Sequence, residues 1–589
     1  MQINAEFQEE KIKKELDQNF SAKKIMWSEK TTDKNLELSL TKKFNLNPII
    51  SKILVARNVN LSNFEKFHNP SIREIMPDPS TLDEMNLATK KIVDFILNKK
   101  KIGIFGDYDV DGSVSTAMIC SYFRDIGVDF EYYIPDRLKE GYGPNNKAFD
   151  SLRKKDCELI ITLDCGTSAV HEIEFIKKKN VEVIVVDHHK QSNILPEACA
   201  IINPNKKTDK SGLSNLCAAG VTFFLLVSLN RELKKYNFFG SSFPNLLNYL
   251  DIVALATICD VVQLDLMNRA FVKQGLKVCN LTKNTGLLSL INESSIKETI
   301  NSYHLGFIIG PRINAGGRVG KSSVGTDLLL CKDQTLSGVM ASKLGEYNKL
   351  RKRIELEVER KAFSQVDSNK KILCVSSDDW HPGVIGIVAS KLCESFNKPA
   401  IVISENKDLC KASCRSTSVC DIGNLILEAI QNNIIQSGGG HKMAAGFTIK
   451  KEKIDLLKDF LEKKKIINDL SYSKFYDYDL NLSSIDHDLF HSIQKIAPFG
   501  QGNPTPKFRI KNCFINFYKI VGDYHMSCVV EDIYGNKFKG ICFNALKNNI
   551  YEYLESSISN SFDVIAVLKN NRWNGDENIE VQIEDLIPN

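Results

Sequence analysis

Five short apolar runs, separated by spacers long enough for helices, constrain the fold of this 589-residue chain more than any other feature. Short runs spaced in this way are typical of strands that are buried on both faces of a parallel sheet. The sequence therefore predicts an α/β fold with a mostly parallel sheet. The predicted strands span residues 101–105, 130–134, 159–163, 181–186 and 200–202.

The loop after the first predicted strand carries three alternating carboxylates. They are Asp107, Asp109 and Asp111, and Gly112 then lets the chain turn. Alternating carboxylates in a loop are typical of a hard-oxygen site for Mg²⁺ or Mn²⁺. An EF-hand loop begins similarly, but its twelfth position, counted from Asp107, would be Met118 rather than a glutamate, which argues against an EF-hand. The structural alternative is that these aspartates cap the next helix.

Acidic residues and histidines also follow later apolar runs. Asp164 follows the third strand, Asp187-His188-His189 follows the fourth, and Asp260 ends a later apolar segment. Taken singly, Asp164 could cap a helix and the histidine pair could be a surface run. Because ligands bind at the carboxyl ends of parallel strands, we expect these side chains to converge on one sheet edge. Such a cluster would repel itself unless cations neutralise it, and two divalent ions are the arrangement used in phosphoryl chemistry.

Composition restricts the class of protein only broadly. The net charge of +5 is mildly basic, so it permits a nucleic-acid partner without requiring one. The 16 cysteines include no CxxC pair, and the closest group, Cys410, Cys414 and Cys420, lacks a matching histidine pair, which argues against zinc. We expect buried, reduced cysteines in a soluble cytoplasmic protein. The longest apolar stretch, residues 216–229, is too short to span a membrane, and the first residues contain no apolar signal region.

Pattern changes outside the predicted sheet suggest further parts of the chain. The first 46 residues are weakly patterned and are predicted to form an arm, and helical spacing then continues to residue 100. Helix formers dominate residues 325–366, where a basic cluster near residue 350 could be solvated or could face phosphates. A second α/β unit is predicted over about residues 370–465, with strands at 372–375 and 400–404 and a helix at 386–394.

Short runs beyond residue 500 predict a small all-β domain. They span residues 508–510, 513–518, 525–530, 537–543 and 562–568. Basic and aromatic residues interleave in these runs, as in Lys507-Phe508-Arg509. This pattern predicts either a groove in which bases stack and cations follow phosphates, or a plain β core.

The motifs, taken in order, resemble those of the DHH phosphoesterase family. Its four motifs are matched by Asp109-x-Asp111, by Asp164, by the Asp-His-His of residues 187–189, and by Asp260. Longer motifs look like those of RecJ, the single-stranded-DNA-specific exonuclease type within this family. These motifs are at residues 106–112, 140–143, 311–318, 380–390, 439–446 and 498–504, and the resemblance runs from about residue 47 onward.

The resemblance implies both a domain plan and an activity. The expected parts are an N-terminal arm (1–46), a DHH catalytic domain (47–325), connecting helices (326–368), a DHHA1 domain (369–466) and an OB-fold nucleic-acid-binding domain (467–589). The expected activity is 5′→3′ hydrolysis of single-stranded DNA to 5′-mononucleotides in DNA recombination and repair. Expected partners are single-stranded DNA, a helicase and a single-strand-binding protein, with no membrane.

The resemblance also implies roles for the clustered residues around two Mn²⁺ or Mg²⁺ ions. Asp109 and Asp164 are expected to hold one ion. Asp164 is expected to bridge to a second ion, which is held by Asp111, His188 and Asp260. Three neighbours complete the expected site: His189 facing the scissile phosphate, Asp187 orienting the histidines, and Asp107 as a ligand or a support for one.

Substrate-binding residues are implied at matching motif positions. They are Tyr142, Arg312, Asn314, Arg318, Ser413, Arg415, Ser416, Gly439, Gly440 and His441. Arg415 suits a terminal phosphate because its planar fork binds phosphate bidentately. The alternatives are that Tyr142 is simple core packing and that the glycine run is a flexible turn. The chain departs from many relatives at Phe105, where they place a metal-binding histidine.

Two rival functions remain open from the sequence. One is a DHH phosphodiesterase of short oligonucleotides or cyclic dinucleotides, which would not need the extra β domain or the long linker. The other is a non-catalytic Cdc45-like DNA-binding scaffold, which predicts eroded metal motifs, whereas every carboxylate and both histidines are present here.

Overall fold

The computed structural model describes residues 20–191, 194–240, 243–464, 473–557, 561–573 and 576–589. The chain divides into two compact units. The larger unit is Pro70–Asn468, and the smaller one combines Met1–Asn69 with Asp469–Asn589. Within the described ranges, no helix has the length and apolar character needed to cross a membrane.

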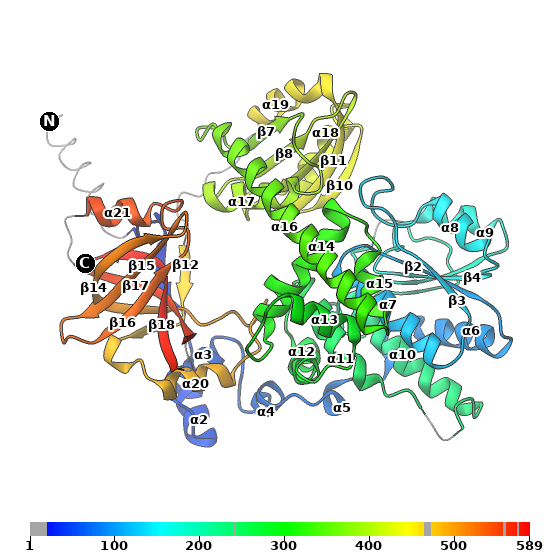
Figure 1. The fold of residues 1–589 in the computed structure, drawn as a ribbon, viewed down its shortest axis with the longest axis horizontal. Coiled ribbons are helices and arrows are strands. Elements are labelled where there is room, and N and C mark those ends of the chain that lie inside the picture. Colours follow the sequence, from blue (N-terminus) through cyan, green and yellow to red (C-terminus); the bar gives the residue numbers. More distant parts are fainter. Residues whose placement is uncertain (1–19, 192–193, 241–242, 465–472, 558–560, 574–575) are drawn as a thin grey trace. The chain divides into compact units, whose positions relative to one another are not determined.

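A five-stranded parallel sheet lies at the centre of the first half of the larger unit (Figure 1). Its strand order is β3-β2-β4-β5-β6, and every neighbouring pair is parallel. The strands are β2 (Ile102–Gly106), β3 (Phe130–Tyr133), β4 (Leu159–Leu163), β5 (Glu182–Val186) and β6 (Ala200–Ile202). The predicted fold class is confirmed, because every strand predicted from an apolar run is present.

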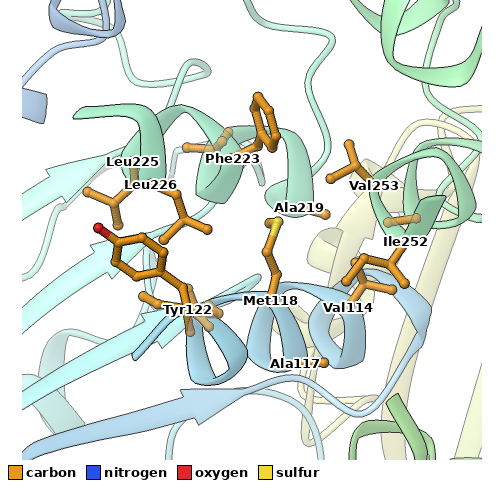
Figure 2. Close-up of a cluster of buried hydrophobic side chains, with 14 of the residues drawn as sticks. Val114, Ala117, Met118, Tyr122, Ala219, Phe223, Leu225, Leu226, Ile252 and Val253 are labelled. Carbon is orange, nitrogen blue, oxygen red and sulfur yellow. The ribbon is translucent and has the colours of Figure 1, made fainter. Parts of the chain in front are cut away.

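Helices cover both faces of this sheet (Figure 1). One face carries α6 (Met85–Leu97), α7 (Val110–Asp125), α10 (Ala218–Lys235) and α11 (Leu250–Cys259), and the other carries α8 (Asn146–Arg153) and α9 (Val170–Lys177). Figure 2 shows Met118 and Tyr122 of α7 packed with Phe223 of α10 and Ile252 of α11. Helices α7 and α11 are buried on nearly all sides, as expected for helices with no polar face.

A group of shorter helices continues from α11 to a long connecting helix. They are α12 (Leu266–Cys279), α13 (Thr285–Glu293), the π-helix η3 (His304–Ile309), α14 (Gly310–Val319) and α15 (Val324–Leu330). The connecting helix α16 (Gln334–Ser364) has 31 residues. Lys391 makes ion pairs of 2.6 Å with Glu355 and 2.7 Å with Glu359. These pairs join α16 to the next part of the unit, and Arg351 of the basic cluster also pairs with Glu355.

A second, mixed sheet forms the end of the larger unit. Its order is β10-β11-β9-β8-β7, in which only β7 and β8 are parallel. The strands are β7 (Leu373–Ser377), β8 (Ala400–Ser404), β9 (Leu409–Arg415), β10 (Ser437–His441) and β11 (Ala444–Lys450). The helices are α17 (Ile385–Phe396), α18 (Ile422–Gln431) and α19 (Ile454–Glu462). The glycine run is therefore strand β10, not a turn.

The smaller unit is built on a six-stranded sheet that closes on itself. Its order is β13-β14-β15-β16-β18-β17, and an additional pairing between β14 and β17 closes the barrel. The strands are β13 (Tyr478–Leu480), β14 (Phe508–Val521), β15 (His525–Asp532), β16 (Lys537–Cys542), β17 (Phe562–Trp573) and β18 (Asp576–Pro588). Helices α20 (His487–Lys495) and α21 (Ile550–Ser556) accompany them.

The predicted N-terminal arm is wrong for residues 20–46, while residues 1–19 lie outside the described residues. Strand β1 (Met26–Glu29) pairs in parallel with β12 (Ser473–Tyr476), and α2 (Lys34–Phe44) follows it. Trp27 Nε1 donates to Asp585 at 2.9 Å. This segment is anchored to the barrel, and its weak pattern did not show it because the partners lie more than 400 residues along the chain.

The predicted start of the catalytic domain at residue 47 is also corrected. Helices α3 (Pro48–Val55) and α4 (Phe64–His68) belong to the smaller unit. Arg57 donates to the Asn503 side chain and, at 2.7 Å, to the carbonyl of Pro504. The 498–504 motif therefore has a structural role in this unit, because it fixes the N-terminal helices to the C-terminal strands.

Candidate metal centre

The predicted metal-binding residues lie together where the strands of the parallel sheet end. The His188 Nε2 atom lies 3.2 Å from Asp164 Oδ1 and 3.7 Å from Asp111 Oδ2. Its distance to Asp260 Oδ2 is 3.6 Å. Asp260 reaches the same point from the end of α11, so four separate parts of the chain meet here.

Asp164 lies between two groups of ligand atoms. One group combines Asp107, Asp109 and Asp164, with ligand atoms within 4.8 Å of one another. Asp164 also forms a group of the same size with His188 and His189. This central place is compatible with a bridging role, and the assignment of each residue to a particular ion stays a prediction.

Local geometry explains the loop that carries the first three aspartates. Asp109 Oδ1 accepts from the backbone N–H of Gly112 at 3.1 Å, so it caps α7 as well as facing the cluster. A Cβ at Gly112 would lie 2.6 Å from the Asp107 carbonyl carbon. The loop can therefore close in this form only with glycine. Capping and metal binding are compatible, because a carboxylate has two oxygens.

Asp111 is held by the N-terminus of another helix. Its two oxygens accept from the backbone N–H groups of Ala218, at 2.6 Å, and Ala219, at 2.8 Å. The positive end of the α10 dipole stabilises this carboxylate. The sequence offered no sign of this contact, because the partners lie more than 100 residues apart.

Asp187 fixes the orientation of the histidine pair. Its Oδ1 accepts from the backbone N–H of His188 at 2.7 Å and from that of His189 at 3.1 Å. The His189 ring Nδ1 lies 2.8 Å from the same oxygen. Thr167 N–H donates to the other oxygen at 3.0 Å. Asp187 is thus fully engaged away from the cluster, while the His189 side chain remains 48% exposed.

The backbone of Asp164 adopts a left-handed conformation with φ of 62°. Such a conformation costs about 1–3 kcal/mol in a non-glycine residue and is concentrated at functional sites. The Asp164 N–H donates to the carbonyl of Val186 at 3.0 Å, and its carbonyl accepts from the Tyr142 hydroxyl at 3.1 Å. These contacts hold the residue so that its side chain points into the cluster.

Burial and mutual repulsion make the cluster costly without a cation. Burial, together with neighbouring carboxylates, raises the pKa of Asp164 well above its usual value and raises that of Asp260 to about 9. Burial lowers the pKa of His188. Although burial opposes it, the hydrogen bond with Asp187 raises the pKa of His189 to about 9.

Unsatisfied buried atoms provide a test of whether metal ions fit. Asp164 Oδ1, His188 Nε2 and Asp260 Oδ2 are buried and have no hydrogen-bond partner. Asp107 Oδ1 is also buried without a hydrogen-bond partner. Polar atoms left in this way are costly unless something else satisfies them. Carboxylate oxygens and one imidazole nitrogen are suitable ligands for Mg²⁺ or Mn²⁺, so the residues fit divalent cations.

A basic pocket of about 440 Å³ lies in the larger unit between the parallel sheet domain and the mixed sheet domain. Its charged lining residues are Arg137, Arg318, Arg415 and Lys411, with no carboxylate among the lining residues. The predicted Ser413 also lines it. Burial lowers the pKa of Arg318 to about 10, which leaves it charged at neutral pH. The pocket is therefore suited to an anion such as phosphate.

Arg137 was missed by sequence reasoning. Its guanidinium lies 5.0 Å from the ring centroid of Tyr108, the residue after Asp107. An isolated arginine before the 140–143 motif belongs to no motif of its own. Its position just upstream of that motif was the only available sign.

The other predicted substrate-binding residues do not line this pocket. Ser416 is buried and donates to the Cys420 carbonyl at 2.7 Å, so it has a structural contact instead. Tyr142 is 55% exposed, which makes simple core packing wrong. Arg312 and Asn314 lie on α14. Gly439, Gly440 and His441 are exposed on β10.

Phe105 lies in the core instead of the cluster. It is fully buried, and its ring centroid lies 6.0 Å from that of Tyr133 and 5.7 Å from that of Phe149. It supplies no ligand, so the cluster here is made of carboxylates and the two histidines.

Three parts of the chain match known families. Residues 101–257 match the DHH family N-terminal domain, residues 369–465 match the DHHA1 domain, and residues 476–585 match the RecJ OB domain. Several curated relatives carry the name single-stranded-DNA-specific exonuclease RecJ. The protein from Bacillus subtilis is 30% identical over 96% of this chain and 71% of its own length. The protein from Haemophilus influenzae is 28% identical, over 94% of this chain and 99% of its own length.

Solved structures have the same architecture. The Thermus thermophilus RecJ complex with Mn²⁺ aligns with a TM-score of 0.79 at 24% identity, over 94% of this chain and 78% of that one, which supports the fold. An exonuclease RecJ bound to manganese aligns with a TM-score of 0.57 at 30% identity. That alignment covers 65% of this chain and 94% of the other.

Proposed function

The chain belongs to the RecJ family of single-stranded-DNA-specific exonucleases, and we propose that it degrades single-stranded DNA from the 5′ end to 5′-mononucleotides. The observation that carries this proposal is the pairing of two sites in one unit. A buried cluster of carboxylates with unsatisfied oxygens lies in the same unit as a pocket lined by arginines. The first suits metal-dependent phosphodiester hydrolysis, and the second suits a terminal phosphate.

Two groups of residues would hold two divalent cations, Mn²⁺ or Mg²⁺. Asp107, Asp109 and Asp164 form one group, and Asp164 with Asp111, His188 and Asp260 forms the other. When bound, the cations would activate water and offset charge on the phosphate. The manganese complexes of the related exonucleases support this choice of metal.

His189 would act on the scissile phosphate. In the metal-free protein, the hydrogen bond with Asp187 overcomes burial and raises the pKa of His189 to about 9, and Asp187 holds its Nδ1 side. A protonated imidazole, half exposed at the edge of the cluster, can donate a hydrogen bond to a phosphate oxygen and so stabilise developing negative charge.

The arginine pocket would set the polarity of cleavage. Arg137, Arg318 and Arg415 can hold a terminal phosphate, and Ser413 can donate to it. A strand fixed by its 5′ phosphate presents its first phosphodiester bond to the metal centre, which yields mononucleotides. The alternatives are not favoured: a cyclic dinucleotide has no terminal phosphate, an enzyme of short oligonucleotides would not need the extra β domain, and a non-catalytic scaffold needs no metal ligands.

Partners and location follow from this activity. An enzyme that requires single strands depends on a helicase to separate duplex DNA, and it meets strands coated by single-strand-binding protein. A reducing cytoplasm is supported by the 16 cysteines, which are all free.

The test uses single-stranded DNA labelled at the 5′ or the 3′ end, duplex DNA and a dinucleotide, each with Mg²⁺ or Mn²⁺. We expect 5′-labelled mononucleotide as the first product from the single strand and little cleavage of blunt duplex. A first product from the 3′ end, or turnover of the dinucleotide alone, would contradict the proposal.

A further inference from the structure

Two neighbouring aromatic side chains are exposed close in sequence to α14. Tyr303 is 56% exposed and Phe307 is 71% exposed. Their rings are stacked, with centroids 5.2 Å apart and planes inclined by 23°. Phe307 belongs to the π-helix η3, a type of element that is frequent at functional sites. A stacked aromatic pair that faces solvent suggests a partner with flat, apolar surfaces.

The element that carries these rings is packed tightly onto the end of α11. A Cβ at Gly306 would lie 3.1 Å from Ile258 Cγ2, and one at Gly310 would lie 2.3 Å from Cys259 Sγ. These two glycines let the backbone of η3 and α14 approach the last residues before Asp260. The aromatic pair is therefore attached rigidly beside a helix that ends in the metal centre.

A cation with an unsatisfied N–H follows the aromatic pair. Arg312 Nη1 donates to the Ile308 carbonyl at 2.7 Å, whereas its Nε is buried without a partner. A guanidinium next to exposed aromatic rings is the combination by which proteins bind single-stranded nucleic acids. Val261, the residue after Asp260, is 65% exposed and has a φ of 56°. Such a backbone is unusual for a β-branched residue, and strain of this kind is concentrated at functional sites.

We propose that Tyr303 and Phe307 form a stacking platform for bases of the DNA strand, close in the chain to Arg312, which the family resemblance already implies as a substrate-binding residue. This inference rests on the proposed function and adds a binding site to it. DNA bases are favoured over a protein partner because Arg312 binds the carbonyl of Ile308, the residue after Phe307, and because the backbone that carries the rings packs on the helix that leads to Asp260. Stacking tolerates every base, since each has a π face, which suits an enzyme that degrades any sequence.

The experiment compares Phe307→Ala with the wild-type protein on two single strands of equal length. One strand carries normal bases and the other carries abasic residues beyond its first nucleotides, so both keep the same phosphates. We expect Phe307→Ala to raise KM on the normal strand by roughly 5- to 150-fold, the loss of one base–aromatic stack. On the abasic strand, KM of the variant and of the wild type should agree.

Two further variants separate stacking from general damage. Phe307→Trp keeps an aromatic face and should restore KM on the normal strand. Tyr236→Ala removes a tyrosine that is 57% exposed after α10, outside the proposed platform, and should leave both KM values unchanged.

Three results would contradict the stacking platform, and only the last of them would also reject the proposed function. An unchanged KM for Phe307→Ala on normal DNA would overturn the platform and would leave this surface for a protein partner. An equal rise in KM on both strands would overturn it too, because stacking would not be the cause. A wild-type protein that does not degrade single strands would instead reject the proposed function, and the inference with it.

Discussion

Asp164 is the residue on which the metal centre most depends. It belongs to two groups of ligand atoms, one with Asp107 and Asp109 and the other with His188 and His189. Its backbone is held in a left-handed conformation. The sequence predicted this residue and the other carboxylates, because each follows directly on an apolar strand or helix. It could not predict Arg137 or the contact between Asp111 and α10, because these depend on residues that are distant in sequence.

We predict that Asp164→Ala abolishes cleavage while the fold persists. Both ions would lose a ligand, so kcat should fall by more than the roughly 10- to 100-fold typical of losing a group that only supports the ligands. Asp107→Ala should cost less, because Asp107 belongs to one group only. Single-turnover cleavage with saturating Mn²⁺ measures this, and circular dichroism checks the fold. Turnover close to wild type would reject the metal assignment.

The pKa values predict how stability depends on pH. In the metal-free protein, Asp260 and His189 each have a pKa of about 9, above the ordinary 3.8 and 6.5. The folded state therefore binds more protons than the unfolded state up to about pH 9, so these two groups make stability fall as pH rises through that range.

Metal binding should oppose this loss of stability at high pH, because the metal-ligating side chains bind the ions in their deprotonated form. We expect the melting temperature in a chelator to fall between about pH 6.5 and pH 9, and the increase caused by Mn²⁺ to be largest at the alkaline end. Differential scanning calorimetry measures both. The control is Asp260→Asn, which should flatten the slope in the chelator. A Mn²⁺ effect that shrinks as pH rises would contradict the assigned protonation states.

Arg415→Ala should weaken preference for a 5′ phosphate more than it slows cleavage. Loss of one charge-assisted hydrogen bond costs about 1.5–3 kcal/mol. The measurement is the ratio of kcat/KM on 5′-phosphorylated and 5′-hydroxyl strands. Arg353→Ala is the control, since Arg353 is exposed on α16 and does not line the pocket. An unaltered ratio in Arg415→Ala would show that the phosphate is bound elsewhere.

At the scale of elements, the strands of the parallel sheet were predictable because burial on both faces makes them continuous apolar runs. The N-terminal strand β1 was not, since it alternates exposed and half-buried positions and pairs with β12 far along the chain. The glycines of β10 were predicted to bind substrate, with a flexible turn as the alternative, and neither interpretation predicted a strand because glycines carry no side-chain pattern. In the structure, two of these glycines lie against the backbone of β11 too closely for any Cβ.

The loop between β2 and α7 allows a prediction about an element. Gly112→Ala would place a Cβ 2.6 Å from the Asp107 backbone, so the loop with Asp107 and Asp109 must shift relative to the first turn of α7, which carries Asp111. We expect Mn²⁺ affinity, measured by isothermal titration calorimetry, to fall by at least about 10-fold. Gly338→Ala is the matched control, because that glycine lies in α16 with open space around it. It should leave Mn²⁺ affinity unchanged and stabilise the helix by about 0.5–1 kcal/mol. Equal Mn²⁺ affinity in the two variants would show that the loop tolerates the added carbon.

At the scale of the whole molecule, the sequence predicted the order of the domains along the chain. It did not predict that the N-terminal segment packs with the C-terminal strands in one unit. Residues 20–69 complete the C-terminal β unit, in which β14, β15, β16, β18 and β17 close into a barrel and β13 adds to β14. A truncation after residue 468 alone would leave the N-terminal helices without the strands that anchor them. A fragment of residues 70–468 removes the whole smaller unit and should remain folded, because it has its own sheets and cores.

This fragment tests whether the smaller unit contacts DNA. Most of the basic residues that suggested a phosphate-binding groove are engaged in ion pairs: Lys507 with Glu584, Arg509 and Lys511 with Asp479, Lys537 with Glu531, and Lys539 with Glu580. Lys519 is exposed on β14. Phe508 lies in the core, whereas Phe517 is 82% exposed and Tyr534 is 81% exposed. The exposed groups in these strands and turns therefore include aromatic rings, and all but Lys519 of the basic residues that suggested the groove are paired with carboxylates.

We consequently expect removal of the smaller unit to raise KM on long single strands. The dependence of KM on salt concentration should change little. The slope of log KM against log salt counts the phosphates that are neutralised, at about 0.7 per phosphate for single strands. Loss of stacking alone should raise KM at every salt concentration by a similar factor, and turnover of short oligonucleotides should persist. The measurement is KM on long and short strands at several salt concentrations, for the full chain and for residues 70–468. A slope that falls by one or more would mean that the ion-paired cations exchange their carboxylates for DNA phosphates, and an unchanged KM would leave this unit without a role in binding the strand.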